Sequence, residues 1–165
     1  MKSQKQKITP LLYDTYCAMV KNSMGARTFR NVYACVDGKK KDITKNSRRS
    51  CAFFVSSILL SSTSVLHAVK LICEIHITVG STVKDLALSG WKHVRTLKRG
   101  SILVWEKDRD GYPHIGFYVG NNKAISYSSN KKTPVMHHFT YGVKNGKPVR
   151  KIEAIYWHKK LSSKK

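Results

Sequence analysis

Lys45-Asn-Ser-Arg-Arg-Ser-Cys-Ala-Phe-Phe-Val-Ser-Ser-Ile-Leu-Leu60 joins a basic, turn-forming stretch to an apolar run that begins at Cys51. Ser50 is a residue type that caps helix N-termini, so the stretch predicts a buried helix over residues 51–61. The positive end of a helix favours a thiolate over a thiol, and the two arginines before Ser50 act in the same direction. We therefore predict that Cys51 is a reactive thiol. The alternative is a cysteine buried as a small hydrophobe.

A second stretch, Pro113-His-Ile-Gly-Phe-Tyr-Val119, predicts a β-strand because its apolar residues alternate. The odd-numbered residues from Ile115 onward share one face, which we predict to be the core face. His114 falls on the opposite face, beside Gly116, whose lack of a side chain lets a substrate come close. A thiol nucleophile needs a base, so we pair His114 with Cys51. A purely structural histidine is the alternative.

These stretches resemble the NlpC and CHAP branches of the papain-like cysteine peptidases. The resemblance is carried by residues 50–56, 98–105 and 114–125 and extends over about residues 47 to 128. In that superfamily a cysteine opens the central helix, a Lys-Pro-Gly-Asp-like turn leads into the first strand, and a His-Val/Ile-Gly-Ile/Phe-Tyr strand carries the base. This chain differs at two places, because Ser50 replaces an acidic or small residue and Ser101 replaces the aspartate.

The third catalytic residue of the superfamily is a polar side chain that orients the histidine from the following strand. If Gly120-Asn-Asn122 forms a three-residue hairpin turn, the numbers of paired residues sum to 242. Ser126 then lies opposite Gly116, and Ser128 lies opposite His114, both on the face of the histidine. Ser126 is at the position that matches the family motif.

His137 and His138 are rival candidates for this third position. Adjacent strand residues point to opposite faces, so at most one of them can reach the site. The resemblance implies a thiol hydrolase that cleaves an amide bond, in peptidoglycan first of all, through an acyl-enzyme formed on Cys51. His114 would take the thiol proton and return it to the leaving amine. Trp91 and Tyr118 are candidates to line the cleft, and no cofactor is implied.

The remaining elements follow from hydrophobic periodicity and turn residues. Helices are predicted near residues 8–24, 51–61 and 81–90, an extended segment near 32–36, and strands near 101–106, 113–119, 123–128, 133–140 and 150–157. Helices followed by antiparallel strands indicate an α+β fold. The expectation is a single papain-like domain over residues 1–165, with N-terminal helices, a central helix carrying Cys51 packed on an antiparallel sheet, and short basic termini.

The charge of the chain is strongly positive. Lysine and arginine number 31 against nine acidic residues, which gives a net charge of +22. Such a charge attracts polyanions without selecting among them. The sequence contains no helix-turn-helix, zinc-finger or RNP-like motif, so no specific nucleic-acid partner is predicted.

The four cysteines lack a close-spaced framework and are predicted to be reduced, with Cys17 and Cys73 buried as small hydrophobes. Only Cys73 and His76 offer a pair of zinc ligands, and no metal is predicted. We identify no signal peptide and no apolar run long enough to span a bilayer. The sequence does not decide whether the protein stays in the cytoplasm or is exported by another route.

Two other function classes compete with the hydrolase. One is a catalytically silent papain-like scaffold that binds an anionic partner, nucleic acid or cell-wall polymer, through its basic surface. Its motivation is that Ser126 orients an imidazole less strongly than a carboxylate or a second imidazole would. The other is a small nucleic-acid-binding protein, which explains the charge but leaves the pairing of Cys51 with His114 to coincidence.

Overall fold

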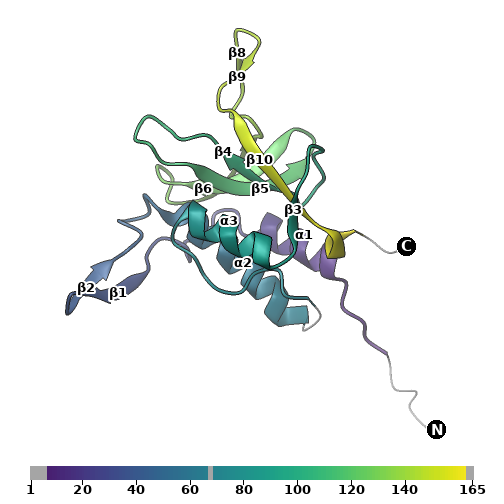
Figure 1. Cartoon of the computed structure of the whole chain (residues 1–165), viewed down its shortest axis with the longest axis horizontal. Helices are drawn as coiled ribbons and strands as arrows, with labels where there is room; N and C mark the ends of the chain where they lie inside the picture. The colour runs from purple at the N-terminus through teal and green to yellow at the C-terminus, as the bar shows by residue number, and fades with distance from the viewer. Residues whose placement is uncertain (1–6, 67–68, 163–165) are drawn as a thin grey trace.

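The computed structural model describes residues 7–66 and 69–162 of the chain (Figure 1). The helices in these residues are α1 (Leu12–Asn22), α2 (Ser50–Leu66), α3 (Val79–Leu88) and the short 3-10 helix η1 (Lys159–Leu161). The strands are β1 (Tyr33–Val36), β2 (Lys39–Asp42), β3 (Trp91–His93), β4 (Ile102–Trp105), β5 (His114–Gly120), β6 (Lys123–Ser128), β7 (Thr133–His138), β8 (Val143–Lys144), β9 (Lys147–Pro148) and β10 (Ile152–His158). None of the helices within the described ranges has the length and apolar content needed to cross a bilayer.

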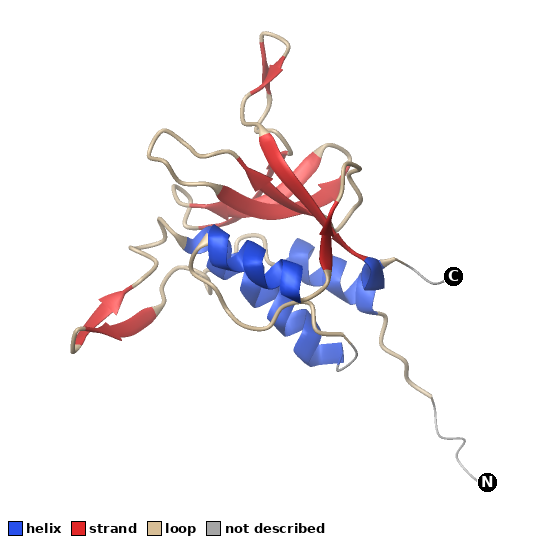
Figure 2. Ribbon diagram, in the orientation of Figure 1, coloured by secondary structure: helices blue, strands red, loops and turns tan. Residues whose placement is uncertain are grey.

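The main sheet has the strand order β3-β10-β4-β5-β6-β7, and every neighbouring pair is antiparallel. Figure 2 shows the α-helices gathered on one face of this sheet. The predicted α+β class is therefore confirmed. Two small hairpins, β1-β2 and β8-β9, project from this body (Figure 1). The sequence did not predict β3 or the β8-β9 hairpin, and it predicted only the first strand of the β1-β2 hairpin.

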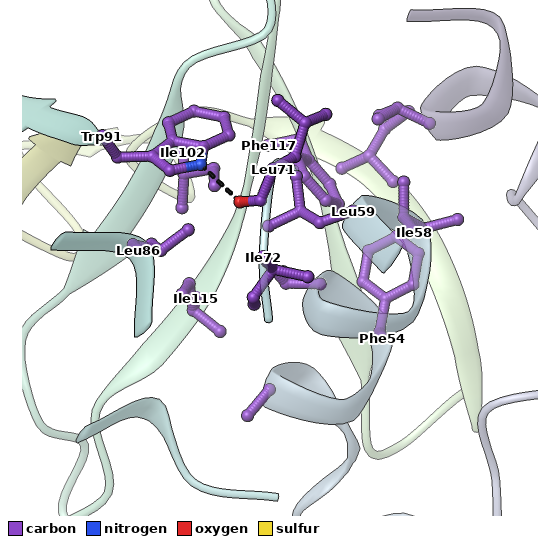
Figure 3. Packing of buried hydrophobic residues seen from close by; sticks show 14 of the residues in the cluster. Phe54, Ile58, Leu59, Leu71, Ile72, Leu86, Trp91, Ile102, Ile115 and Phe117 are labelled. Carbon is purple, nitrogen blue, oxygen red and sulfur yellow. Dashed lines mark hydrogen bonds between the residues drawn. The ribbon is translucent and has the colours of Figure 1, made fainter. Parts of the chain in front are cut away.

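The core lies between α2 and the sheet. Phe54 and Leu59 of α2 are fully buried, as are Ile115 and Phe117 of β5 (Figure 3). The rings of Phe54 and Phe117 pack edge to face with centroids 5.5 Å apart. Burial of each side chain of this size contributes about 1.5–3 kcal/mol, which fixes α2 on the sheet. The odd-numbered face of β5 is the core face, as predicted.

Helix α2 differs from the prediction at both ends. Ser50 is its first helical residue and not its cap, because the Ser50 hydroxyl donates to the carbonyl oxygen of Arg30 at 3.4 Å. The helix ends at Leu66, five residues later than expected, because Ser62 and Thr63 donate their hydroxyls to carbonyl oxygens one turn earlier, at 2.8 and 3.0 Å. Hydroxyls satisfied in this way do not interrupt a helix.

Other boundaries shift for local reasons. Helix α1 begins at Leu12, after Pro10, so the proline precedes the helix and is not part of its first turn. Helix α3 begins at Val79 because Thr78 is the cap and accepts the N–H of Ser81 at 3.1 Å. The expected start at residue 81 is two residues late.

Asp85 of α3 holds the irregular segment after α2. Its carboxylate accepts a hydrogen bond from Nε2 of His76 at 2.7 Å and from the backbone N–H of Cys73 at 3.0 Å. Trp91 donates its indole N–H to Leu71 at 2.7 Å (Figure 3). These anchors turn Leu71 into the core and leave Cys73 exposed, so the prediction that Cys73 is buried is wrong.

Candidate active site

Cys51 lies in the first turn of α2 and is half-buried. Backbone groups of Ile115, Ala52 and Cys51 itself are placed to hydrogen-bond its sulfur in the thiolate form. Ile115 follows His114 directly on β5, and α2 packs on this strand. The packing of α2 against β5 thus brings Cys51 to Ile115, the residue that follows the predicted base in the chain.

The pKa of Cys51 differs from the prediction. Burial raises the pKa of the thiol, and this effect exceeds the lowering by the backbone N–H groups and by the nearby Arg150 guanidinium. The backbone at the helix N-terminus lowers the pKa of Cys51 as expected, but burial raises it by more. The cationic contribution comes from Arg150, which lies far along the chain, and not from the arginines that precede Ser50. The resting group is a neutral thiol.

The position of Ser126 was predicted correctly. Gly116 pairs with Ser126 across β5 and β6, and Phe117 pairs with Ile125, so the register sum of 242 is confirmed over this part of the hairpin. A bulge then shifts the register, and Gly120 pairs with Lys123. Close approach at this point requires a glycine, because a Cβ on Gly116 would lie 2.7 Å from the Cβ of Ser126.

The Ser126 hydroxyl is the centre of a hydrogen-bonded cluster. Its oxygen lies 3.0 Å from Nε2 of His114, 2.8 Å from Nε2 of His137 and 3.1 Å from the hydroxyl of Tyr141. Ser126 itself is almost completely buried. Two of the four candidates for the third position, Ser126 and His137, therefore lie in one cluster.

The donor and acceptor of each hydrogen bond in the cluster can be assigned by starting from the contact between His137 and the backbone of His138. The carbonyl oxygen of His138 only accepts, so Nδ1 of His137 carries a proton and donates to it at 2.7 Å. Burial lowers the pKa of His137, so its ring is neutral at neutral pH and its Nε2 bears a lone pair. The Ser126 hydroxyl must then donate to His137, and it accepts from Nε2–H of His114 and from the Tyr141 hydroxyl.

This arrangement selects one tautomer of His114. With the proton on Nε2, the lone pair is on Nδ1, which is the atom left to receive a proton from a thiol. Burial lowers the pKa of His114 to about 3, with smaller contributions from the charges of Arg150 and His137, while Asp108 opposes them. The histidine is therefore neutral over the physiological range and has a free lone pair, but its low pKa makes it a weak base.

Aromatic packing fixes the rings of the cluster. His137 stacks on Tyr141 with ring centroids 4.1 Å apart. The Trp105 ring lies 5.7 Å from His114 and from His137, and 5.6 Å from Tyr141. Its indole N–H is bound by the carbonyl oxygen of Phe139 at 2.7 Å, so the tryptophan is itself held in place. The rings of the cluster therefore pack on one another and on Trp105, and the charge of Cys51 acts on Tyr141.

The other candidate residues lie outside the cluster. Ser128 caps a turn by accepting the N–H of Lys131 at 3.2 Å, and Nδ1 of His138 is bonded to Thr140 at 2.9 Å. Trp91 is buried in the core and does not line a cleft. Tyr118 lines a hollow of about 240 Å³ that contains Cys17 but neither Cys51 nor His114.

Sequence reasoning did not find Tyr141 and Arg150. Both lie next to the β8-β9 hairpin, outside the stretches that carry the resemblance. The Arg150 guanidinium lies 5.7 Å from the centre of the Tyr141 ring. Gly142, which follows Tyr141, and Gly146, which lies between the two strands, mark turns in the sequence but do not show that the chain returns to the site.

No protein-family model matches the chain, and no curated protein matches it in sequence. Among solved structures, its fold is similar to that of NlpC2 from Trichomonas vaginalis, with a TM-score of 0.52 and 17% sequence identity. The match covers 92% of this chain and 48% of NlpC2, so the chain spans about half the length of that neighbour. At this identity the likeness shows an NlpC-like fold and nothing about activity.

Proposed function

We propose that the protein is a thiol hydrolase that cleaves an amide bond by acyl transfer, with Cys51 as nucleophile and His114 as base. The observation that carries the proposal is the direction of the hydrogen bonds in the Ser126 cluster, which leaves the lone pair of His114 on Nδ1. The backbone of Ile115, the next residue on β5, lies at the sulfur of Cys51. The NlpC-like fold supports the same assignment.

The resting pair is neutral, so the thiol proton moves to Nδ1 of His114 as the sulfur attacks the amide carbonyl. A carbon–sulfur bond forms, and the carbonyl oxygen gains negative charge that the backbone N–H of Cys51 helps to stabilise. The imidazolium then protonates the leaving amine, and the carbon–nitrogen bond breaks. Water, deprotonated by His114, hydrolyses the thioester.

Ser126 and His137 are positioning residues in this mechanism. When His114 becomes an imidazolium, its Nε2–H bond to the Ser126 oxygen becomes charge-assisted, and His137 holds that oxygen in orientation. A histidine thus supports the base through a hydroxyl instead of bonding it directly. The proposed substrate is an amide of peptidoglycan, a cross-bridge, stem-peptide or sugar-to-peptide linkage.

We expect Ser126→Ala to lower kcat about 10- to 100-fold, which corresponds to one lost hydrogen bond to a charged group. His137→Phe keeps a ring against Tyr141 but removes the acceptor, and its effect should be similar. The double variant should be little worse than either single one, because both act through one bond. Ser128→Ala is the matched control. Fully additive effects in the double variant would contradict a shared path.

The silent scaffold is the second candidate, and the net charge of +22 favours it. If the basic surface supplies only long-range attraction, affinity for DNA, RNA and anionic wall polymer should be similar and should fall about 10³- to 10⁵-fold between 50 and 200 mM salt, as expected for roughly 6–10 neutralised anionic groups. Fluorescence anisotropy with scrambled sequences measures this. A salt-tolerant complex with one sequence would favour specific nucleic-acid recognition instead.

A further inference from the structure

Two guanidinium groups converge on Tyr112, two residues before His114. Arg49, two residues before Cys51, donates to the Tyr112 hydroxyl at 2.8 Å, and its guanidinium lies 4.9 Å from the centre of that ring. Arg150 approaches from the opposite end of the chain and donates to the carbonyl oxygen of Tyr112 at 3.1 Å. Tyr112 therefore links Arg49, which precedes α2, to Arg150, which precedes β10.

Both arginines are held by neutral acceptors. Arg150 donates twice more to the carbonyl oxygen of Glu106, at 3.1 and 2.7 Å. The Glu106 carboxylate does not bind Arg150 and instead accepts the backbone N–H of Lys151 at 2.7 Å. The Asp108 carboxylate accepts the backbone N–H groups of Asp110 and Tyr112 in its own turn. Across residues 7–66 and 69–162, neither guanidinium lies within ion-pair distance of a carboxylate.

Two arginines held in place without a counter-ion favour an anionic ligand. The planar guanidinium matches a carboxylate in shape and binds it through charge-assisted bonds. Arg150 also lies over the Tyr141 ring, which belongs to the Ser126 cluster, and its charge acts on both Cys51 and His114. An anion bound by Arg150 would therefore lie near the reacting groups, and Arg49 would reach it from the other side of Tyr112.

We propose that Arg49 and Arg150 form a subsite that binds a carboxylate of the substrate beside the scissile amide. The inference rests on the proposed role of Cys51 as nucleophile, and it narrows the substrate to amides that carry a carboxylate near the cleaved bond.

The test compares iodoacetate with iodoacetamide. In both reactions the cysteine sulfur bonds to the methylene carbon and iodide leaves, but only iodoacetate carries a carboxylate. The ratio of the two alkylation rates at one cysteine is independent of its thiolate fraction. At pH 8 we expect this ratio at Cys51 to exceed that at the exposed Cys35 about tenfold, which is one charge-assisted bond of about 1.4 kcal/mol.

Substitutions distinguish the effect of Arg49 and Arg150 on this rate ratio from the effect of other positive charges. Arg150→Gln and Arg49→Gln should each lower the Cys51 ratio toward that of Cys35, and Arg48→Gln, which removes the same charge from an exposed neighbour, should leave it unchanged. Mass mapping of the labelled cysteines gives the rates.

The outcomes distinguish the subsite from the proposed function. A Cys51 ratio equal to that of Cys35 overturns the subsite alone, as does a high ratio that persists in both Arg49→Gln and Arg150→Gln. A Cys51 that reacts with neither reagent, while Cys35 reacts with both, overturns the nucleophile and the subsite with it. The wild-type comparison needs no variant, so poor folding of Arg150→Gln does not weaken the test.

Discussion

Cys51→Ala and His114→Ala should each lower the rate of hydrolysis of a peptidoglycan-derived amide by about 10⁴-fold or more. In the proposed mechanism the thiol supplies the bond-forming electron pair and the imidazole accepts the thiol proton, so neither group works without the other. The double variant should therefore be no slower than the slower single one. Release of the amine, followed by chromatography and mass spectrometry, measures the rate.

Cys35→Ser is the matched control for the nucleophile, because Cys35 is exposed on β1 and should leave the rate unchanged. Thermal melting shows whether the inactive variants remain folded. Hydrolysis that persists in folded Cys51→Ala would place the chemistry elsewhere. A wild-type protein inert toward every amide and thioester tried would favour the silent scaffold.

The second large effect concerns stability. Asp85→Asn should lower the free energy of unfolding by about 3–5 kcal/mol, because it removes the charge of a buried pair and replaces one accepting oxygen with an NH2 group that faces other donors. The two side chains are only 6% and 9% exposed. Asp37→Asn is the control, since the Asp37 to Lys41 pair is exposed and should contribute less than about 1 kcal/mol. Denaturant unfolding of both variants gives the comparison, and equal small effects would contradict the anchoring role of Asp85.

The same aspartate makes stability depend on pH. Burial would raise the pKa of Asp85, but hydrogen bonds from His76, Cys73 and Ser89 hold it well below its usual range. Its folded form therefore binds fewer protons than its unfolded form in mild acid. The stabilisation is complete above the ordinary carboxyl pKa of about 4 and is lost as the pH falls below it. Asp85→Asn should flatten this dependence.

Local signals in the sequence were sufficient for the hairpin that carries the site. Alternation on β5 gave the face of His114, and the expected three-residue turn over 120–122 gave the register that places Ser126. The length of that turn was wrong, because Gly120 pairs with Lys123 and the turn consists of Asn121 and Asn122, both at positive φ. Asparagine and glycine tolerate this backbone conformation, so the turn could be recognised from its residues. The cysteine at the start of an apolar helix was found for the same reason.

Features that depend on distant segments were not predictable in this way. The pKa of Cys51 depends on how deeply α2 is buried against β5, which no helix-end rule contains. Tyr141 follows β7, which pairs with β6, and Arg150 lies just before β10, which pairs with β4. Cys73 is exposed because the carboxylate of Asp85 binds its backbone N–H and fixes the path of the irregular segment. Each depends on packing between segments far apart in the chain.

The most direct test of the central claim is intact-mass analysis of the protein quenched in acid during turnover of soluble peptidoglycan fragments. We expect a mass increase equal to the acyl part of the substrate, located on Cys51 by peptide mapping, removed by neutral hydroxylamine as a thioester is, and missing from Cys51→Ala. An acyl group on another residue would contradict the account. So would turnover without any acyl group on Cys51 after the same quench, if none is found even in His114→Gln, in which hydrolysis of the thioester should be slow.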